Sequence, residues 1–217
     1  MKHKPAFVLL LLFFAVSAVT AQNDAQKPAI KRIDIIISGN VFSGSYYTVY
    51  YKDFKPDDVS QEVYDGLWEI QKEVIDNFTY DYDVYYGRKK HQYLTTKEDF
   101  YTYGKGVCEN YTNFFILLAR EKGLTENLYK VSGGSHAWLE YHTAENKYII
   151  DPTWSDDYIY YQGKDTKKKY RESPAYGKQA FFITYEEDKI IFRRRDHSSY
   201  TRGKTEIPLW DKEEETP

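Results

Sequence analysis

The sequence predicts an α+β fold in which a helix that begins at Cys108 packs on an antiparallel sheet. Apolar residues recur at i, i+3, i+4 and i+7 shortly after this cysteine, which indicates a helix with one buried face. The members of this stripe are Tyr111, Phe114, Phe115 and Leu118. Three segments further along have the composition of strands and are separated by turn residues: 127–132, 135–142 and 147–151. A short turn near Ala144 pairs the last two as an antiparallel hairpin.

The first 21 residues have the pattern of a secretory signal peptide. Basic residues at the start precede an apolar run, residues 6–16, that is too short to span a bilayer comfortably. Small side chains at the positions that a signal peptidase reads place the cleavage after Ala21. We therefore expect an exported bacterial protein, secreted, periplasmic or at the cell surface, that keeps no stable membrane anchor. A retained signal anchor is the less favoured alternative.

The charge balance argues against nucleic acid as a partner. The chain has 30 basic and 33 acidic residues, which gives a net charge of −3 with neutral histidines. Loss of Lys2 and Lys4 with the signal peptide leaves 28 basic residues against the same 33 acidic ones, so the mature net charge is −5. Domains that bind nucleic acid carry a clustered basic surface instead.

The chain divides into four segments. After the signal peptide, residues 22–55 are predicted to form an N-terminal extension or β-arm with two strands, 30–38 and 46–54. These strands can pair as a hairpin that either packs on the main domain or stands away from it. The main domain spans residues 56–208, and residues 209–217 form an acidic tail.

The main domain opens with an amphipathic helix after Pro56. Its apolar residues follow one another at steps of four, three, four and four, so they form one stripe that faces the core. They are Val63, Leu67, Ile70, Val74 and Phe78. Residues 79–94 are rich in tyrosine and show no period, which predicts a surface loop. Thr95-Thr96-Lys97-Glu98 matches a capping box and predicts a short helix that ends near Gly104.

Cys108 is the only cysteine, and it opens the helix that follows Gly104-Lys105-Gly106. Unpaired backbone N–H groups and the helix dipole favour a thiolate at this position. No internal disulfide can form, so an exported protein would keep this thiol either buried or in use. A buried structural cysteine is the alternative, because lone cysteines commonly pack as small hydrophobic residues. No cysteine or histidine pair has the spacing of a zinc site, so we expect neither a metal nor another cofactor.

The hairpin after this helix brings a histidine close to an aspartate. Pairing about Ala144 places His136 opposite Asp151 to within one register step, and directly opposed Cβ atoms are about 5 Å apart. Asp151 can then accept an imidazole N–H and fix the tautomer of the ring. If the helix packs across the hairpin, His136 meets Cys108. A thiolate–imidazolium pair of this kind is the activated nucleophile of acyl transfer.

Three blocks of this sequence together resemble the transglutaminase-like superfamily. The blocks are Gly106-Val107-Cys108-Glu109-Asn110-Tyr111, His136-Ala137-Trp138 and Asp151-Pro152-Thr153-Trp154-Ser155-Asp156. The resemblance covers roughly residues 60–160. It implies a papain-like fold in which Cys108, His136 and Asp151 form the triad of a catalytic domain, residues 56–208.

Five further residues are candidates for the oxyanion hole or the substrate groove. Gln92, Tyr93 and Tyr103 lie upstream of the cysteine, and in the family a side chain from this region completes the oxyanion hole. Each also fits a surface or packing position. Trp138 and Trp154 flank the triad and could shield it from water or line the groove, although burial in the core is the simpler explanation of Trp138.

The sequence thus predicts an exported thiol acyl-transfer enzyme that acts on amide bonds of proteins or peptides, with cell-surface and cell-wall peptides among the candidate substrates. Transfer of the acyl group to water would make it a cysteine protease or amidase, and transfer to an amine would make it a cross-linking transglutaminase. The resemblance to bacterial members favours hydrolysis slightly. A non-catalytic module that binds peptide or wall polymer, either in the same cleft or on the tyrosine-rich surface, is the alternative from another class.

Overall fold

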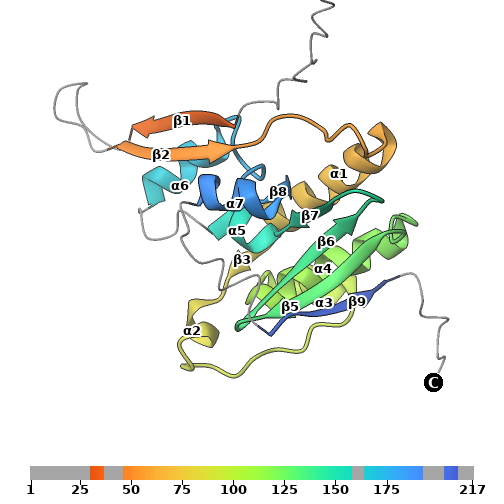
Figure 1. Ribbon diagram of the computed structural model, residues 1–217. Coiled ribbons are helices and arrows are strands. Elements are labelled where there is room, and N and C mark those ends of the chain that lie inside the picture. Colours follow the sequence, from red (N-terminus) through yellow and green to blue (C-terminus); the bar gives the residue numbers. More distant parts are fainter. Residues whose placement is uncertain (1–29, 37–45, 158–163, 193–202, 210–217) are drawn as a thin grey trace, which may run out of the picture.

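The computed structural model describes residues 30–36, 46–157, 164–192 and 203–209. The predicted signal peptide lies outside the described residues, as do parts of the predicted extension and most of the predicted acidic tail. In the described part, helices and an antiparallel sheet form an α+β fold, as the sequence predicts (Figure 1). No helix in this part is both long and apolar enough to cross a membrane.

A five-stranded antiparallel sheet forms the centre of the fold, with the strand order β8-β7-β6-β5-β9. The strands are β5 (Leu128–Gly133), β6 (His136–His142), β7 (Lys147–Ile150), β8 (Phe181–Ile183) and β9 (Thr205–Pro208). The three predicted strands correspond to β5, β6 and β7, and their ends agree to within one residue. β9 comes from the far end of the chain and closes the sheet beside β5.

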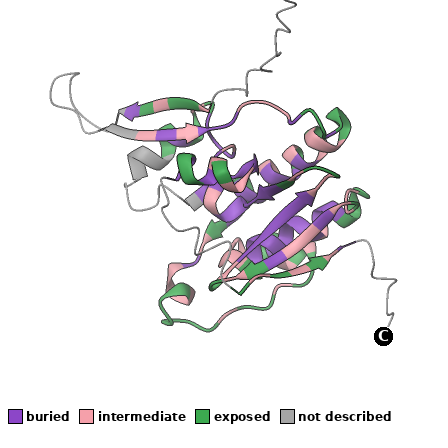
Figure 2. Cartoon of the chain, viewed as in Figure 1, coloured by how far each residue is buried: buried purple, intermediate pink, exposed green. Residues whose placement is uncertain are grey.

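The helix that begins at Cys108 packs on one face of this sheet. It is α4 (Cys108–Glu121), which lies against β6 and is flanked by α1 (Gln61–Asn77) and α3 (Lys97–Tyr103) (Figure 1). The predicted apolar stripes of α1 and α4 meet the sheet in the main core, which is the buried centre of Figure 2. Its members include Leu67, Ile70, Val74, Phe78, Tyr111, Phe114, Phe115, Leu118, Leu128, Leu139 and Ile150.

Capping residues determine where these helices begin and end. α1 starts five residues after Pro56, because the Ser60 hydroxyl accepts a backbone N–H of its first turn. α3 starts at a capping box formed by Thr96 and Asp99, one residue later than the predicted box. Gly104 ends α3 with a φ of 65°, a left-handed conformation that glycine adopts without strain.

The predicted surface loop, residues 79–94, contains two short elements. The strand β3 (Thr79–Tyr80) pairs in parallel with β4 (Lys105–Gly106), directly before Cys108. A one-turn helix, α2 (Tyr82–Tyr85), follows β3 and is capped by the Asp81 carboxylate. The loop is therefore attached to the segment that leads into α4.

The opposite face of the sheet packs against α7 (Tyr185–Ile191). Buried residues of the sheet and of the α7 region form a second cluster that includes Val131, Trp138, Ile149, Ile183, Ile191 and Phe192. The described part of the predicted extension is a hairpin of β1 (Lys31–Ile36) and β2 (Tyr46–Tyr51). Its residues Ile35, Val49 and Tyr51 pack on Ile75 of α1 and on Tyr170 of α6 (Lys164–Arg171). The hairpin therefore packs on the main body.

We expect Phe114→Ala to lower the free energy of unfolding by about 3–5 kcal/mol, because it removes a large ring from a closely packed core. Phe114 is fully buried, and its ring stacks on that of Phe100 with centroids 4.7 Å apart. Urea unfolding followed by circular dichroism measures the change. Tyr93→Ala is the matched control, since Tyr93 is 87% exposed, and should cost less than about 0.5 kcal/mol. Equal losses in the two variants would contradict this packing.

Candidate active site

Cys108 is the first residue of α4 and is half-buried. The turn before it is held by Asn110, whose side-chain Oδ1 accepts the Val107 N–H at 3.1 Å. Gly106 passes so close to this side chain that an added Cβ would lie 2.5 Å from the Asn110 Cβ, so only glycine fits there. The thiol is thus presented at the helix N-terminus by a tightly fixed turn.

His136 and Asp151 form the closest polar contact of the site. The His136 Nε2 lies 2.6 Å from Asp151 Oδ2, and the Asp151 side chain has no exposed surface. The other carboxylate oxygen, Oδ1, accepts the backbone N–H of Trp154 at 3.0 Å. Asp151 lies between the end of β7 and the start of α5 (Pro152–Asp157), so it joins the two elements.

The histidine and the aspartate meet along a diagonal of the hairpin. Leu139 is paired with Ile150, so the register, continued by one position, places Asp151 opposite Trp138. His136 lies two residues further along the same face of β6. Diagonal neighbours in a sheet remain within reach of long side chains, which accounts for the contact.

The imidazole of His136 is shared between the carboxylate and the thiol. Burial disfavours the charged form of the imidazole and lowers its pKa. The Asp151 carboxylate, and after it Cys108, attract and hydrogen-bond the charged ring. Their effects outweigh burial and raise the pKa of His136 to about 9. Since Nε2 faces Asp151, the other ring nitrogen, Nδ1, is left for the thiol. The arrangement keeps a proton on the imidazole at neutral pH.

Two tryptophans contact this imidazole. The Trp138 ring is fully buried and lies nearly parallel to the His136 ring, with centroids 5.8 Å apart and an interplanar angle of 15°. Trp154 meets the same ring edge-on at 6.0 Å. Both restrict where the imidazole can turn, and Trp138 does so from within the second core cluster.

The three upstream candidates lie in different surroundings. Gln92 and Tyr93 are exposed, and Tyr103 is half-buried at the end of α3 with the Lys105 ammonium 5.9 Å from its ring centroid. The backbone carbonyl of Gln92, rather than its side chain, reaches the site, because it accepts the Asn110 Nδ2–H at 3.0 Å.

Residues 57–152 match the family model of the transglutaminase-like superfamily, and this range contains Cys108, His136 and Asp151. The chain carries a transglutaminase-like domain. Members of this superfamily are commonly cysteine-dependent enzymes. No curated protein matches the chain.

Two groups that support the candidate site are not predicted from the sequence. Asn110 is one of them, although a polar side chain at the third position of a helix is a known signal for a bond back to the cap. The second is Tyr111, which was predicted only as a core residue. Its hydroxyl donates to the buried Asp156 carboxylate at 2.7 Å, and the Phe78 carbonyl at the end of α1 lies 3.3 Å from the same oxygen, so Tyr111 connects α4 with α5 and with the end of α1.

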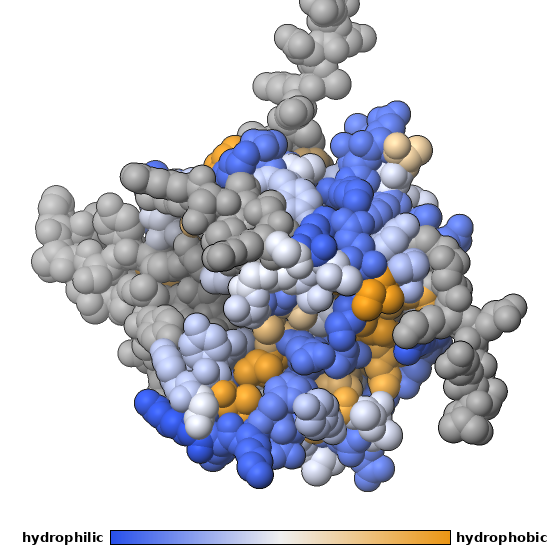
Figure 3. Space-filling view, turned by 60° about the horizontal axis from the view of Figure 1, so that its bottom comes forward, coloured by the Kyte–Doolittle hydropathy of each residue, from blue (hydrophilic) through white to orange (hydrophobic). Residues whose placement is uncertain are grey.

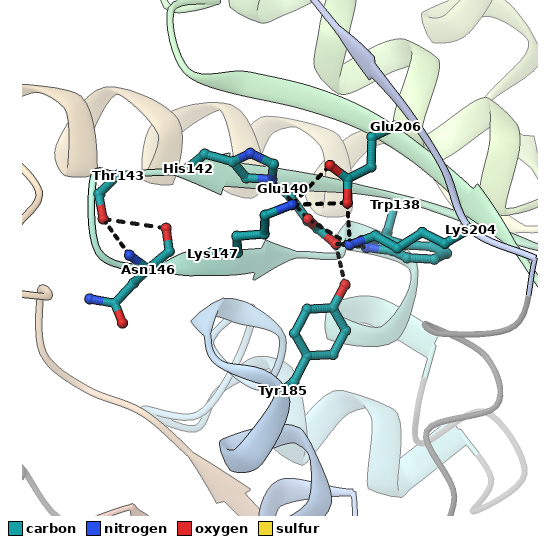
Figure 4. Close-up of polar contacts among 9 residues, drawn as sticks. All are labelled: Trp138, Glu140, His142, Thr143, Asn146, Lys147, Tyr185, Lys204 and Glu206. Atoms are coloured by element: carbon teal, nitrogen blue, oxygen red, sulfur yellow. Dashed lines mark hydrogen bonds and ion pairs between the residues drawn. The ribbon is translucent and has the colours of Figure 1, made fainter.

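A buried ion cluster lies further along the same face of β6 (Figure 4). Glu140 has no exposed side-chain surface and accepts hydrogen bonds from Trp138 Nε1 at 3.2 Å, His142 Nε2 at 2.9 Å and the Tyr185 hydroxyl. Lys204 lies 2.8 Å from it. Burial opposes the charge of Glu140, but the bonds from Lys204, Tyr185 and His142 outweigh burial and hold the pKa of Glu140 below its usual range.

This cluster has the ligand types of a metal site but already contains a cation. One ligand atom each from Glu140, His142 and Glu206 lie within 4.8 Å of one another. The Lys204 ammonium lies between the two carboxylates, 2.8 Å from Glu140 and 2.6 Å from Glu206. We therefore interpret the cluster as an ion-pair network that joins β9 to β6 and orients Trp138 against His136.

The imidazole of His136 should titrate near pH 9 in the wild-type protein and below 6.5 in Asp151→Asn, because burial persists while the carboxylate charge is lost. NMR of labelled histidine measures both values, and Asp83→Asn, a surface substitution, is the control. The raised pKa stabilises the fold fully below pH 6.5, and this contribution is lost as the pH rises through 9. An unchanged titration in Asp151→Asn would disprove the pairing.

We expect Glu140→Ala to lower the free energy of unfolding by about 3–5 kcal/mol, because Trp138, His142 and Tyr185 lose the buried carboxylate that they share as hydrogen-bond acceptor. Urea unfolding measures this loss. Glu206→Gln is the matched control, because its side chain is 28% exposed, and should cost no more than about 1 kcal/mol. A Glu140→Ala protein as stable as the wild type would show that the cluster does not hold the fold.

Proposed function

We propose that this protein is an exported thiol acyl-transfer enzyme that acts on amide bonds of proteins or peptides through Cys108, His136 and Asp151. One observation carries the proposal: the His136 imidazole, whose side chain is only 11% exposed, is hydrogen-bonded to a buried carboxylate and interacts with a thiol at a helix N-terminus. This combination stabilises a thiolate–imidazolium pair, which is the attacking species in acyl transfer. The papain-like arrangement of the triad is part of the proposal.

In the first half of the reaction, the Cys108 thiolate attacks the carbonyl carbon of the amide. Negative charge develops on the carbonyl oxygen, and backbone N–H groups in the first turn of α4 are oriented to stabilise it. The His136 imidazolium gives its proton to the departing nitrogen, so an amine leaves and a thioester remains on Cys108. Asp151 holds the ring orientation and stabilises its charge throughout.

In the second half, neutral His136 removes a proton from the incoming nucleophile, which attacks the thioester and releases the thiol. Attack by water gives a carboxylic acid and hydrolysis, whereas attack by an amine gives a new amide and cross-linking. An amine is the preferred acyl acceptor where the site excludes water. Because Cys108 is half-buried rather than enclosed, we favour water and therefore a protease or amidase.

Export is proposed from the sequence of residues 1–21, which has the pattern of a signal peptide. We propose a bacterial extracytoplasmic compartment, where surface proteins and wall peptides are available as substrates.

The pH dependence of Cys108 alkylation by iodoacetamide tests the proposed nucleophile. We expect rapid alkylation below pH 6, because the imidazolium stabilises the thiolate, and loss of this reactivity in His136→Ala. His142→Ala, on the same strand, is the control and should keep it. A single transition near the free-thiol value of about 8.5, unchanged in His136→Ala, would refute the triad.

A separate assay identifies the acyl acceptor. Casein is incubated with the protein and a fluorescent primary amine, and the products are separated by gel electrophoresis. Cleavage without label is expected from hydrolysis, and incorporation of label would favour the transglutaminase alternative. Cys108→Ala should abolish either product.

The second candidate function is a non-catalytic binding module, and the surface around α4 favours it. Two hollows of about 480 and 230 Å³ flank the exposed side of this helix, and both are lined by Asn113, Ile116 and Arg120. Figure 3 shows hydrophobic side chains gathered between hydrophilic ones on the lower part of the molecule. An unreactive Cys108 would leave this surface as the functional one.

A further inference from the structure

Three exposed tyrosines lie in residues 82–93, which we call the tyrosine–basic loop. Tyr85, Tyr86 and Tyr93 are 62%, 51% and 87% exposed, and all three belong to this segment of twelve residues. Large apolar side chains exposed together commonly mark a binding surface. Tyrosine suits such a surface, because it offers a broad ring and a hydroxyl with few rotatable bonds.

The rings at α2 pack against one another. The rings of Tyr82 and Tyr86 are 6.2 Å apart, those of Tyr85 and Tyr86 are 5.1 Å apart, and the Arg88 guanidinium lies 5.2 Å from the Tyr86 ring centroid. The backbone carbonyl of Asp83 accepts N–H groups from Arg88 and Lys89 at 2.7 and 3.1 Å, which closes the turn after α2. A surface ordered in advance loses little entropy when a partner binds.

Both ends of the loop are attached to the backbone that presents the nucleophile. Before the loop, the Asp81 N–H donates to the Gly106 carbonyl at 2.9 Å. Near its other end, the Gln92 carbonyl accepts the Asn110 Nδ2–H at 3.0 Å. Gly106 and Asn110 lie two residues before and two residues after Cys108. The loop therefore keeps a fixed position relative to the thiol.

The charge of the loop is opposite to that of the whole protein. It contains Arg88, Lys89 and Lys90 against one acidic residue, Asp83, so its net charge is +2 with neutral histidine, whereas the whole chain carries −3. Asp83 forms ion pairs with Lys89 at 2.9 Å and Arg88 at 3.7 Å, which hold these basic side chains in place. The loop keeps a net positive charge, because one carboxylate neutralises only one of its three basic groups. A local positive surface attracts acidic partners to this part of the molecule.

We propose that the tyrosine–basic loop is a docking site for an acidic, extended segment of the polypeptide substrate. Tyrosine rings and the Arg88 guanidinium would contact its side chains, as in other protein interfaces, and the basic groups would select acidic residues. The description of the partner as a substrate rests on the proposed function, whereas the binding itself does not.

Binding is measured on the protein carrying Cys108→Ala, so that no turnover occurs. The probe is a fluorescein-labelled peptide of repeated Glu-Gly-Phe-Asp, compared with the same peptide in which lysine replaces every acidic residue. Fluorescence anisotropy should show at least about tenfold tighter binding of the acidic peptide, weakening as salt is added. Equal binding of the two peptides would overturn the proposal.

Substitutions then locate the site. Adding Tyr85→Ala and Tyr86→Ala together should weaken binding of the acidic peptide at least about tenfold, and Lys90→Glu should weaken it as well. Tyr101→Ala is the matched control, because this tyrosine is 39% exposed but lies on α3 outside the loop. Urea unfolding checks that each variant remains folded. Undiminished binding in the double variant would refute the assignment.

Two further outcomes separate this inference from the proposed function. If Cys108 proves unreactive but the acidic peptide binds through the loop, the enzyme proposal fails and the docking site stands. The other outcome is that a wall oligosaccharide binds, that this binding is lost in the Tyr85→Ala, Tyr86→Ala variant, and that the acidic peptide does not bind. In that case the tyrosines bind sugar and the inference is wrong.

Discussion

The hydrogen bond between His136 and Asp151 is the contact on which the candidate site depends. A carboxylate without exposed surface is unfavourable unless it is paired and hydrogen-bonded. Asp151 meets this condition with His136 on one oxygen and the Trp154 N–H on the other. Because these partners come from β6 and α5, one side chain joins the sheet to the next helix. The same imidazole interacts with Cys108, so this pair is also connected to the first residue of α4.

Patterns within a few residues predict the parts of the structure that local chemistry determines. The start of α4 at Cys108, the buried stripe of α1 and the β6–β7 hairpin are all of this kind. Finer detail exceeds what such patterns can fix. The register places Asp151 on the diagonal from His136, and the capping box of α3 begins at Thr96 rather than Thr95.

Contacts between distant parts of the chain could not be predicted in this way. Tyr185 and Lys204 follow Glu140 by 45 and 64 positions, and no periodicity connects them to it. The cluster around Glu140 requires both β9, which lies beside β5 in the sheet, and α7, which packs on the other face of the sheet. The tyrosine–basic loop is similar, since its composition predicted a surface loop but not its attachment on both sides of Cys108.

The bond from Asn110 to the Gln92 carbonyl makes the choice of expression host important. Asn110-Tyr111-Thr112 has the acceptor pattern for N-glycosylation, and the Asn110 Nδ2 is the atom to which the glycan would be attached. In the folded protein Asn110 is only 2% exposed, so the acceptor is hidden. A eukaryotic secretory pathway meets the chain before it folds, and a sugar added then would occupy the space beside the nucleophile. The same sequence would therefore yield a different product in a bacterial host.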